Sequence, residues 1–276
     1  MLAPFRMVCR DFILPEPASY VFFYALFNLR NLLYIIMKVN PEKCIGCKKC
    51  IPFCPQGAIH VEDKKAFIDQ EECVECGICV RQIECPRKAF YEPEEVRQWP
   101  RSVRKVFGDP TEKHESTGVR GRGTEEVKTN DVTGRVKRGE VGFALEFGRP
   151  SIGCRVKDVE VVTIPLAKMG IEFEPCNPLT SLLDTETGIV HDDVRNEKIL
   201  SAIVEFKIPE ERFAEVAATV YDAAKHCKGT VFSWGLVVRY AEDGTIPVTK
   251  TLDKMGIKYP KNAKVNVGLG RPLTNA

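Results

Sequence analysis

Three apolar stretches in the second half of the chain predict β-strands. They cover residues 140–147, 199–208 and 230–240, and in the first of them apolar and smaller or polar side chains alternate. Between the last two, apolar side chains recur every three to four residues over 209–228. A proline lies near the start of this segment and a glycine follows its end, which predicts a helix.

The remaining elements of this half are shorter. Residues 156–169 have helical spacing, although Pro165 would kink the helix. The pattern further predicts a strand over 171–175, a polar loop over 185–196, a helix over 248–255 and a strand over 264–268. The order β-α-β-β-α-β predicts a ferredoxin-like α/β sandwich over 139–276, so the fold class is α+β. By fold-level analogy, such a sheet can bind a small-molecule ligand or pair edge to edge in a homo-oligomer.

The first 36 residues differ from the rest. Residues 20–36 are strongly apolar and approach the length of a membrane span, but Arg30 lies in their middle, where it costs about 2.5–3.5 kcal/mol on insertion scales. The segment also lacks the small-residue cleavage site of a signal peptide. Three interpretations stay open: a start assigned too early, with Met37 as the true start; a membrane-binding or partner-docking helix; and a buried helix.

Residues 92–138 form the joint between the two halves. We expect a short polar helix over 92–107, followed by a Gly-rich, charged segment over 111–138 that contains only four large apolar residues, all valines. A solvated linker is one interpretation. The other is a loop that binds an anion or an acidic partner through its basic side chains, which are Arg120, Arg122, Lys128, Arg135, Lys137 and Arg138.

Composition narrows the function classes. With 44% hydrophobic and 28% charged residues the chain is globular, and a formal net charge of +2 gives no reason to expect a nucleic-acid partner. Twelve cysteines are the exception, because eight of them lie between residues 44 and 85. Such clustering without a secretion signal indicates metal chemistry in a reducing compartment, so we expect a cytoplasmic protein.

The clustered cysteines form an internal repeat with an offset of 29 residues. Each unit is a C-x2-C-x2-C triplet followed by a separate Cys-Pro pair. A triplet lets three thiolates of one loop reach one cubane, and the fourth cysteine ligates the other cluster. Zinc sites need two pairs of ligands and fit this pattern poorly. The prediction is a first cluster on Cys44, Cys47, Cys50 and Cys85, and a second on Cys73, Cys76, Cys79 and Cys54.

These residues resemble the bacterial-type ferredoxins with two 4Fe-4S clusters. The similarity covers residues 37–91 and includes the segments 55–59 and 66–69. It implies short antiparallel strands around the clusters and one helix after each triplet. The chain departs from the simplest members in one respect, since five residues separate Cys79 from Cys85 where those members have three. This longer spacing enlarges the loop beside the first cluster but removes none of the predicted ligands.

A second resemblance concerns residues 121–134 and 139–177. They are similar to a region of the 6-hydroxynicotinate reductase-type proteins, which are ferredoxin-dependent enzymes of anaerobes. The resemblance implies no particular catalytic residue for this chain.

Other reactive side chains have simpler explanations. We expect the scattered thiols of Cys154, Cys176 and Cys227 to be small buried hydrophobes, and the run His191-Asp192-Asp193 to be part of a polar loop. The sequence contains no nucleophile–base pair and no flavin, molybdenum or nicotinamide motif.

We therefore expect low-potential electron transfer through two 4Fe-4S clusters, as a subunit or partner of an anaerobic oxidoreductase. Two alternatives remain: a ferredoxin-dependent reductase of an N-heterocyclic or acidic organic substrate, and a redox- or ligand-sensing adaptor. Whether the chain is an enzyme by itself stays open. A membrane contact is expected only if residues 1–36 are genuine.

Overall fold

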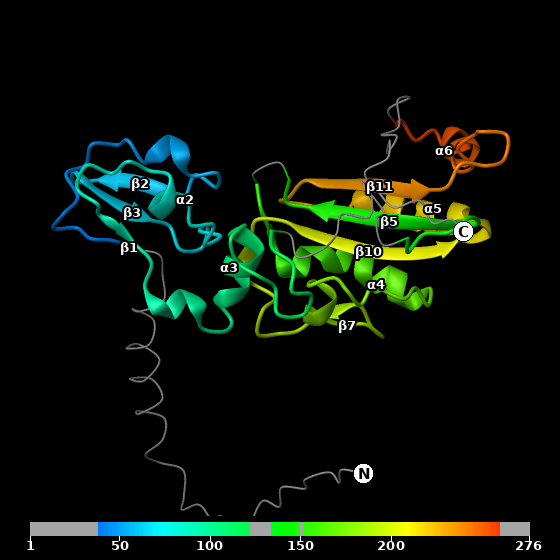
Figure 1. Ribbon diagram of the computed structural model, residues 1–276, viewed down its shortest axis with the longest axis horizontal. Helices are drawn as coiled ribbons and strands as arrows, with labels where there is room; N and C mark the ends of the chain where they lie inside the picture. The colour runs from blue at the N-terminus through cyan, green and yellow to red at the C-terminus, as the bar shows by residue number, and fades with distance from the viewer. Residues whose placement is uncertain (1–37, 122–133, 150–151, 260–276) are drawn as a thin grey trace, which may run out of the picture. The chain divides into compact units, whose positions relative to one another are not determined.

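The computed structural model describes residues 38–121, 134–149 and 152–259 (Figure 1). The chain divides between Ile35 and Ile36, and every described residue belongs to the second unit. The predicted apolar leader over 1–36 and the predicted strand over 264–268 lie outside the described residues. Within the described ranges, no helix is long and apolar enough to span a bilayer.

Two small antiparallel sheets frame the cysteine repeat. β1 (Lys38–Val39) pairs with β4 (Phe90–Tyr91), and β2 (Ile59–Glu62) pairs with β3 (Lys65–Ile68). A two-residue turn joins β2 to β3, and both of its residues, Asp63 and Lys64, have positive φ as this tight hairpin turn requires. Short helical turns, η1 (Ile51–Phe53) and α2 (Ile78–Arg81), lie at the third cysteine of each triplet. These elements agree with the strands and helices that the resemblance implies.

A three-stranded antiparallel sheet organises the second half. Its order is β10-β5-β11, so that β5 (Glu140–Phe147) lies between β10 (Ala202–Pro209) and β11 (Phe232–Val238). Because both outer strands run antiparallel to β5, they are parallel to each other, and α5 (Phe213–Ala224) connects them across it. On the far side of β10, Phe173 forms a single antiparallel bridge to Phe206. The predicted strand over 171–175 is thus reduced to one bridge.

The core of this half lies between the sheet and its helices. α4 (Glu160–Lys168) contacts α5, and the buried side chains of both helices belong to the same apolar cluster as the sheet. The ring of Phe143 on β5 stacks on that of Phe206, with centroids 4.8 Å apart. In α5 most of the predicted apolar stripe is buried, and its sixth member, Ala224, is partly buried. The buried members are Phe213, Val216, Ala217, Val220 and Ala223.

Several predicted boundaries were wrong. The expected helix over 92–107 consists of η2 (Glu94–Arg97) and α3 (Ser102–Gly108), separated by Trp99–Pro100, because a residue before proline disfavours the helical conformation. α3 is also largely buried, and its apolar side chains belong to the core of the second half.

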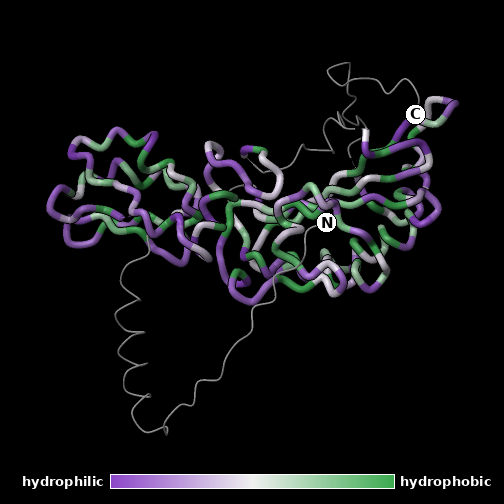
Figure 2. Tube along the Cα trace, turned by 60° about the horizontal axis from the view of Figure 1, so that its bottom comes forward, coloured by the Kyte–Doolittle hydropathy of each residue, from purple (hydrophilic) through white to green (hydrophobic). Residues whose placement is uncertain are grey.

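Figure 2 shows the hydrophobic positions of the sheet strands between their polar connecting turns.

The remaining differences concern residues 154–199 and the ends of helices. The expected polar loop over 185–196 includes the turn and second strand of a hairpin of β7 (Leu183–Asp184) and β8 (Ile189–Val190). The strand over 199–208 is split, because its first residue, Ile199, pairs with Cys154. Helix α4 contains Pro165 and is preceded by a 3-10 turn. The other elements are β6 (Cys154–Arg155) paired with β9 (Lys198–Ile199), η3 (Val156–Val159), η4 (Thr180–Leu182), η5 (Glu210–Arg212) and α6 (Thr249–Lys254).

Truncating the stacked ring tests this core. We expect Phe143→Ala to lower the free energy of unfolding by about 3–5 kcal/mol, because a side chain that is 1% exposed leaves a cavity. The matched control is Ile189→Ala in the hairpin, where the side chain is 42% exposed and the loss should stay below about 1 kcal/mol. Chemical denaturation of the two variants measures both values. Equal losses would contradict this assignment of the core.

Candidate metal centres

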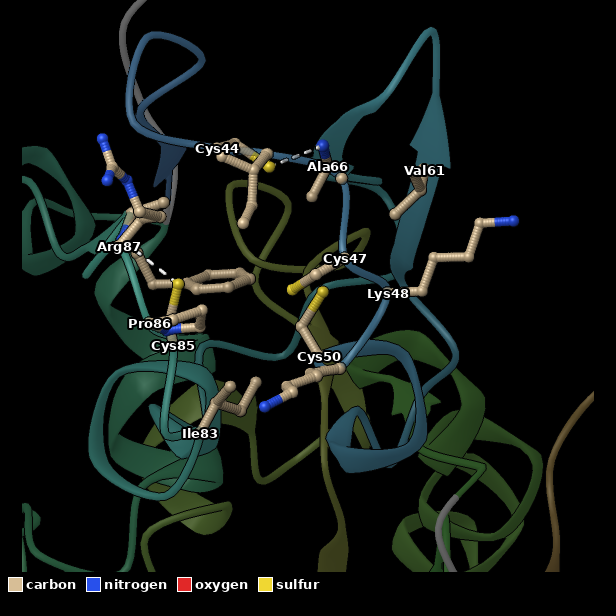
Figure 3. Close-up of a pocket in the computed structure, with 15 residues that line it drawn as sticks. Cys44, Cys47, Lys48, Cys50, Val61, Ala66, Ile83, Cys85, Pro86 and Arg87 are labelled. Carbon is tan, nitrogen blue, oxygen red and sulfur yellow. Dashed lines mark hydrogen bonds between the residues drawn. The ribbon is translucent and has the colours of Figure 1, made fainter.

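The eight clustered cysteines fall into two sets of four in space. Cys44, Cys47, Cys50 and Cys85 line one pocket, which encloses about 380 Å³ of unfilled space, counting the part open to solvent (Figure 3). A second pocket of similar size is lined by Cys54, Cys73, Cys76 and Cys79. The structure therefore brings together the same two sets that the spacing predicts, each with three thiols of one triplet and the fourth cysteine of the other repeat.

Both pockets have apolar walls. In Figure 3 the sulfurs of Cys47, Cys50 and Cys85 point into the shared space, which Ile83 and Val61 border. Ala58, Ile59, Ile68 and Ile78 line the second pocket. Such walls limit the access of water, which is one of the factors that set the potential of an iron–sulfur cluster.

Backbone N–H groups donate hydrogen bonds to three of the sulfurs. Ala66 N lies 3.2 Å from Cys44 Sγ, Ala58 N lies 3.2 Å from Cys54 Sγ, and Ala89 N lies 3.4 Å from Cys85 Sγ. The three donors are buried alanines, whose small side chains let the strand or turn approach the sulfur. A hydrogen bond of this kind favours the thiolate over the thiol.

Without a metal these pockets disfavour thiolates. Burial raises the pKa of Cys50, and the neighbouring thiols of its own set raise it further. In the second pocket burial raises the pKa of Cys79 to about 12, and the pKa of Cys73 also rises above its ordinary value. Four adjacent thiolates therefore need a strong cationic partner, which the iron of a cluster supplies. The donor set fits such a group.

The arrangement differs from a site for one metal ion. Across residues 38–121, 134–149 and 152–259, no three side chains of His, Cys, Asp or Glu converge on a point where a single ion could bind. The thiols instead surround a space, which favours a multi-iron cluster over mononuclear zinc.

One glycine in the first triplet is required by close packing. Gly46 has φ of +67°, and a Cβ there would lie 2.5 Å from the carbonyl oxygen of Lys64 in the β2–β3 turn. The loop between Cys44 and Cys47 can approach this turn only because the position has no side chain.

The charges around the two pockets differ. The first is lined by Lys48, Lys49 and Arg87 and, among the described residues, by no acidic side chain. Glu75 is the only charged residue of the described chain that lines the second, and its side chain is fully buried. The sequence analysis missed the buried carboxylate of Glu75. Its position between the predicted ligands Cys73 and Cys76 was the available signal, because ligands of a buried centre bring the residues between them into the protein interior.

An arginine pairs with this buried carboxylate. Arg101, at the start of α3, donates from Nε to Glu75 Oε1 at 2.8 Å, and its Nη2 contacts the same oxygen. Its Nη1 donates to the carbonyl of Gln70 at 3.0 Å. Arg104, one turn later, donates to the carbonyls of Gln70 at 2.8 Å and Cys73 at 2.9 Å. Two guanidinium groups of α3 thereby fix the loop that carries the second triplet.

We call residues 69–75 the acidic loop, since they include Asp69, Glu71, Glu72 and Glu75. Side chains of the second half pair with it: Arg155 lies 3.2 Å from Glu71, and Lys198 pairs with Glu72. At the end of α3, a Cβ on Gly108 would lie 2.2 Å from the carbonyl oxygen of Val74. The loop that carries the second triplet is therefore held by α3 and by residues that come much later in the chain.

The predicted anion-binding loop receives little support. Arg122 and Lys128 lie outside the described residues. Arg120 is exposed, whereas Arg135 pairs with Glu174 at 3.2 Å and Arg138 donates to the carbonyl of Tyr240. At least two of its guanidinium groups thus bind other parts of the chain. In the separate polar run His191-Asp192-Asp193, Asp193 accepts a hydrogen bond from Trp99 Nε1.

The scattered cysteines follow the prediction in part. Cys154 is buried and belongs to the core, and burial raises its pKa. Cys227 is partly buried, and Cys176 is exposed, which corrects the expectation of burial there.

Removing one partner of the buried pair tests its role. We expect Arg101→Met to lower the free energy of unfolding by about 3–5 kcal/mol, because Glu75 is left as an unpaired buried charge. Arg97→Met is the matched control: the Arg97 side chain is 58% exposed, and its ion pairs should contribute less than about 1 kcal/mol. Denaturation of the metal-loaded protein measures both. A small effect at Arg101 would contradict the dependence of the loop on this pair.

Comparisons with known proteins agree with the geometry. Residues 36–97 match the family model described as a 4Fe-4S dicluster domain. Over 47 residues the chain is 59% identical to a subunit of an ion-translocating oxidoreductase complex from Methanosarcina acetivorans, covering 17% of each chain. It is 49% identical over 52 residues to the pyruvate synthase subunit PorD of Methanothermobacter marburgensis, covering 19% of this chain and 58% of PorD.

A third relative is matched over nearly its whole length. The chain is 35% identical over 75 residues to a protein named Ferredoxin 7Fe from Hydrogenibacillus schlegelii, covering 25% of this chain and 94% of the ferredoxin. For the first two relatives, the chain spans 17% and 58% of their lengths. No solved structure matches the chain.

Proposed function

Since the chain belongs, through residues 36–97, to the ferredoxins with two 4Fe-4S clusters, we propose that it transfers single electrons at low potential between redox partners. The observation that carries the proposal is the division of eight thiols into two sets of four, each around its own pocket. When bound, each cluster supplies one-electron redox chemistry.

We propose the ligands from these sets. Cys44, Cys47, Cys50 and Cys85 would hold the first cluster, and Cys54, Cys73, Cys76 and Cys79 the second. The chain contributes apolar walls that limit water and N–H donors that stabilise sulfur charge, and these are the protein features that set the potential.

The setting is proposed from the relatives. Two of them are named as subunits of larger oxidoreductases, so we propose that this chain serves as an electron-transfer subunit or partner of such an enzyme in the cytoplasm of an anaerobe. For the second half we propose a ferredoxin-like sandwich: the order β11-β5-β10, with Phe173 beyond β10, matches the order of that sheet. Its role would be to dock the partner enzyme or to bind a ligand.

A second candidate function rests on a cleft beside the acidic loop. A cleft that holds about 770 Å³ of unfilled space, counting the part open to solvent, lies between Gln56 and Glu72 on one side and Arg155, Asp158 and Lys198 on the other. Arg155 and Lys198 are paired with Glu71 and Glu72, and an acidic substrate of a ferredoxin-dependent reductase would bind there by replacing these carboxylates. The resemblance to 6-hydroxynicotinate reductase-type proteins stays a prediction.

Metal analysis of single-cysteine variants tests the first candidate. The full chain, purified anaerobically, should contain about eight iron and eight acid-labile sulfide, and dithionite should produce the EPR signal of two interacting reduced clusters. Cys54→Ala and Cys85→Ala should each lower the iron content and remove the interaction, because each removes one ligand of a different cluster. Cys227→Ala is the control and should retain about eight iron.

Three outcomes would contradict this proposal. Zinc in place of iron would remove the redox function. About seven iron in the unaltered chain would show that one centre is not a cubane. A variant Cys54→Ala that leaves the second centre intact but damages the first would overturn the crossed ligand sets.

Cluster reoxidation tests the second candidate. If the chain is a reductase, adding 6-hydroxynicotinate to the dithionite-free reduced protein should reoxidise both clusters, because reduction of the ring takes up two electrons. Lys198→Gln should slow this reaction about tenfold or more if the cleft binds the carboxylate. Clusters that stay reduced would exclude this substrate and leave electron transfer as the function.

A further inference from the structure

The two centres have different access to the surface. Around the second pocket Val74, Glu75 and Gly77 are buried, and the four cysteines are partly buried. Around the first pocket Cys47, Lys48 and Lys49 are exposed. Because electron tunnelling falls steeply with distance, an external protein can exchange electrons rapidly only where a centre lies close to the surface. That centre is the first one.

Three exposed apolar side chains belong to the segment around the first triplet, and one of them, Ile45, lines the first pocket. Ile45, Ile51 and Phe53 have exposed fractions of 57%, 40% and 46%, although they come from one short segment around the first triplet. A single exposed apolar residue needs no explanation, but several within nine residues indicate a contact surface. We call this segment, residues 45–53 together with Arg87, the port surface.

Basic residues outnumber acidic ones on the exposed positions near these apolar side chains in the sequence and near Cys85. Among the exposed residues of 41–53 and 84–88, five are basic (Lys43, Lys48, Lys49, Arg87, Lys88) and two are acidic (Glu42, Glu84). Figure 3 shows the side chains of Lys48 and Arg87 extending away from the pocket. Within the described part of the chain, neither side chain forms an ion pair, so both charges are available to a partner.

We propose that the port surface docks a redox protein with an acidic surface, so that electrons enter or leave through the first centre while the second faces the rest of the chain. This inference rests on the proposed electron-transfer function. An apolar centre with a charged rim is the usual composition of a protein interface. Complementary charge raises the rate of encounter and fixes the orientation. Location favours a redox protein over a membrane, because Ile45, Lys48 and Arg87 of the patch line the pocket that holds the thiols of the first centre.

The charge at the second centre has the opposite sign, which supports docking of an acidic partner at the first centre. Its acidic loop would repel an acidic partner, and that loop is already paired with Arg101, Arg155 and Lys198. Electrons that enter at the port surface would therefore travel inward, from the first centre to the second. The cleft beside Glu72 and Lys198 lies at that inner end.

Charge reversal with charged redox proteins tests the proposal. The test variant is the triple Lys48→Glu, Lys49→Glu, Arg87→Glu. The control is the triple Lys168→Glu, Lys250→Glu, Lys254→Glu, at exposed lysines of α4 and α6. Each triple lowers the formal net charge by six, from +2 to −4. Anaerobically reduced full-length protein is mixed in a stopped-flow instrument with oxidised plastocyanin, an acidic protein, or with cytochrome c, a basic one.

We expect the port-surface triple to slow oxidation by plastocyanin about tenfold or more at low ionic strength, and to speed oxidation by cytochrome c. Added salt should reduce both differences. The control triple should change either rate by less than about threefold. Iron content and EPR of every variant establish that both clusters are present. If the unaltered protein lacks the clusters, the proposed function is refuted and not this inference.

Three results would overturn the inference with both clusters intact. The port-surface triple could react with plastocyanin at the unaltered rate, or both triples could slow it equally, which would show only an effect of net charge. Binding to vesicles of phosphatidylglycerol that the port-surface triple alone abolishes would assign the patch to a membrane. A salt-sensitive dimer in gel filtration, abolished by the same triple, would assign it to a second copy of the chain.

Discussion

The ion pair between Arg101 and the buried carboxylate of Glu75 is the contact on which the arrangement of the second centre depends. A fully buried carboxylate is unfavourable unless a cation and hydrogen bonds replace the lost water. Arg101 supplies both from the first turn of α3, and the same helix places Arg104 against the carbonyls of the loop. Because Val103 and Phe107 of α3 belong to the core of the second half, one short helix joins the triplet loop to the large sheet.

This constraint makes two similar sequence repeats unequal in structure. Each repeat contributes a triplet, a short helical turn and a crossed fourth cysteine. The second repeat, however, contains acidic side chains that later segments pair with, whereas the first carries lysines that remain exposed. The thiols also differ: Cys47 of the first set is exposed, whereas the four cysteines of the second set are partly buried. For an electron conduit this difference makes the first centre the more accessible one to a partner.

The sheet of the second half shows where prediction from local pattern was sufficient and where it was not. The three long strands and the helix over 213–224 were predicted close to their observed bounds, because alternation and a buried stripe are local properties. The strand over 171–175 was reduced to one bridge, since pairing of an edge strand depends on how much of the neighbouring strand it can reach. The hairpin over 183–190 was missed because its strands are two residues each, too short for a periodic signal.

For the candidate metal centres, the sequence by itself determined how the eight cysteines divide into two sets of four around two pockets, because ligand spacing is imposed by the size of a cluster and by the reach of a tight loop. Only the tertiary structure decided what surrounds each set. Nothing in the local pattern around Glu75 or Arg101 indicates that they meet, as they are separated by 26 residues and paired through α3. Likewise, the pairing of Lys198 with Glu72 spans 126 residues. Contacts of this kind depend on how the packed elements bring distant charges together, and burial then makes each unpaired charge too costly to leave.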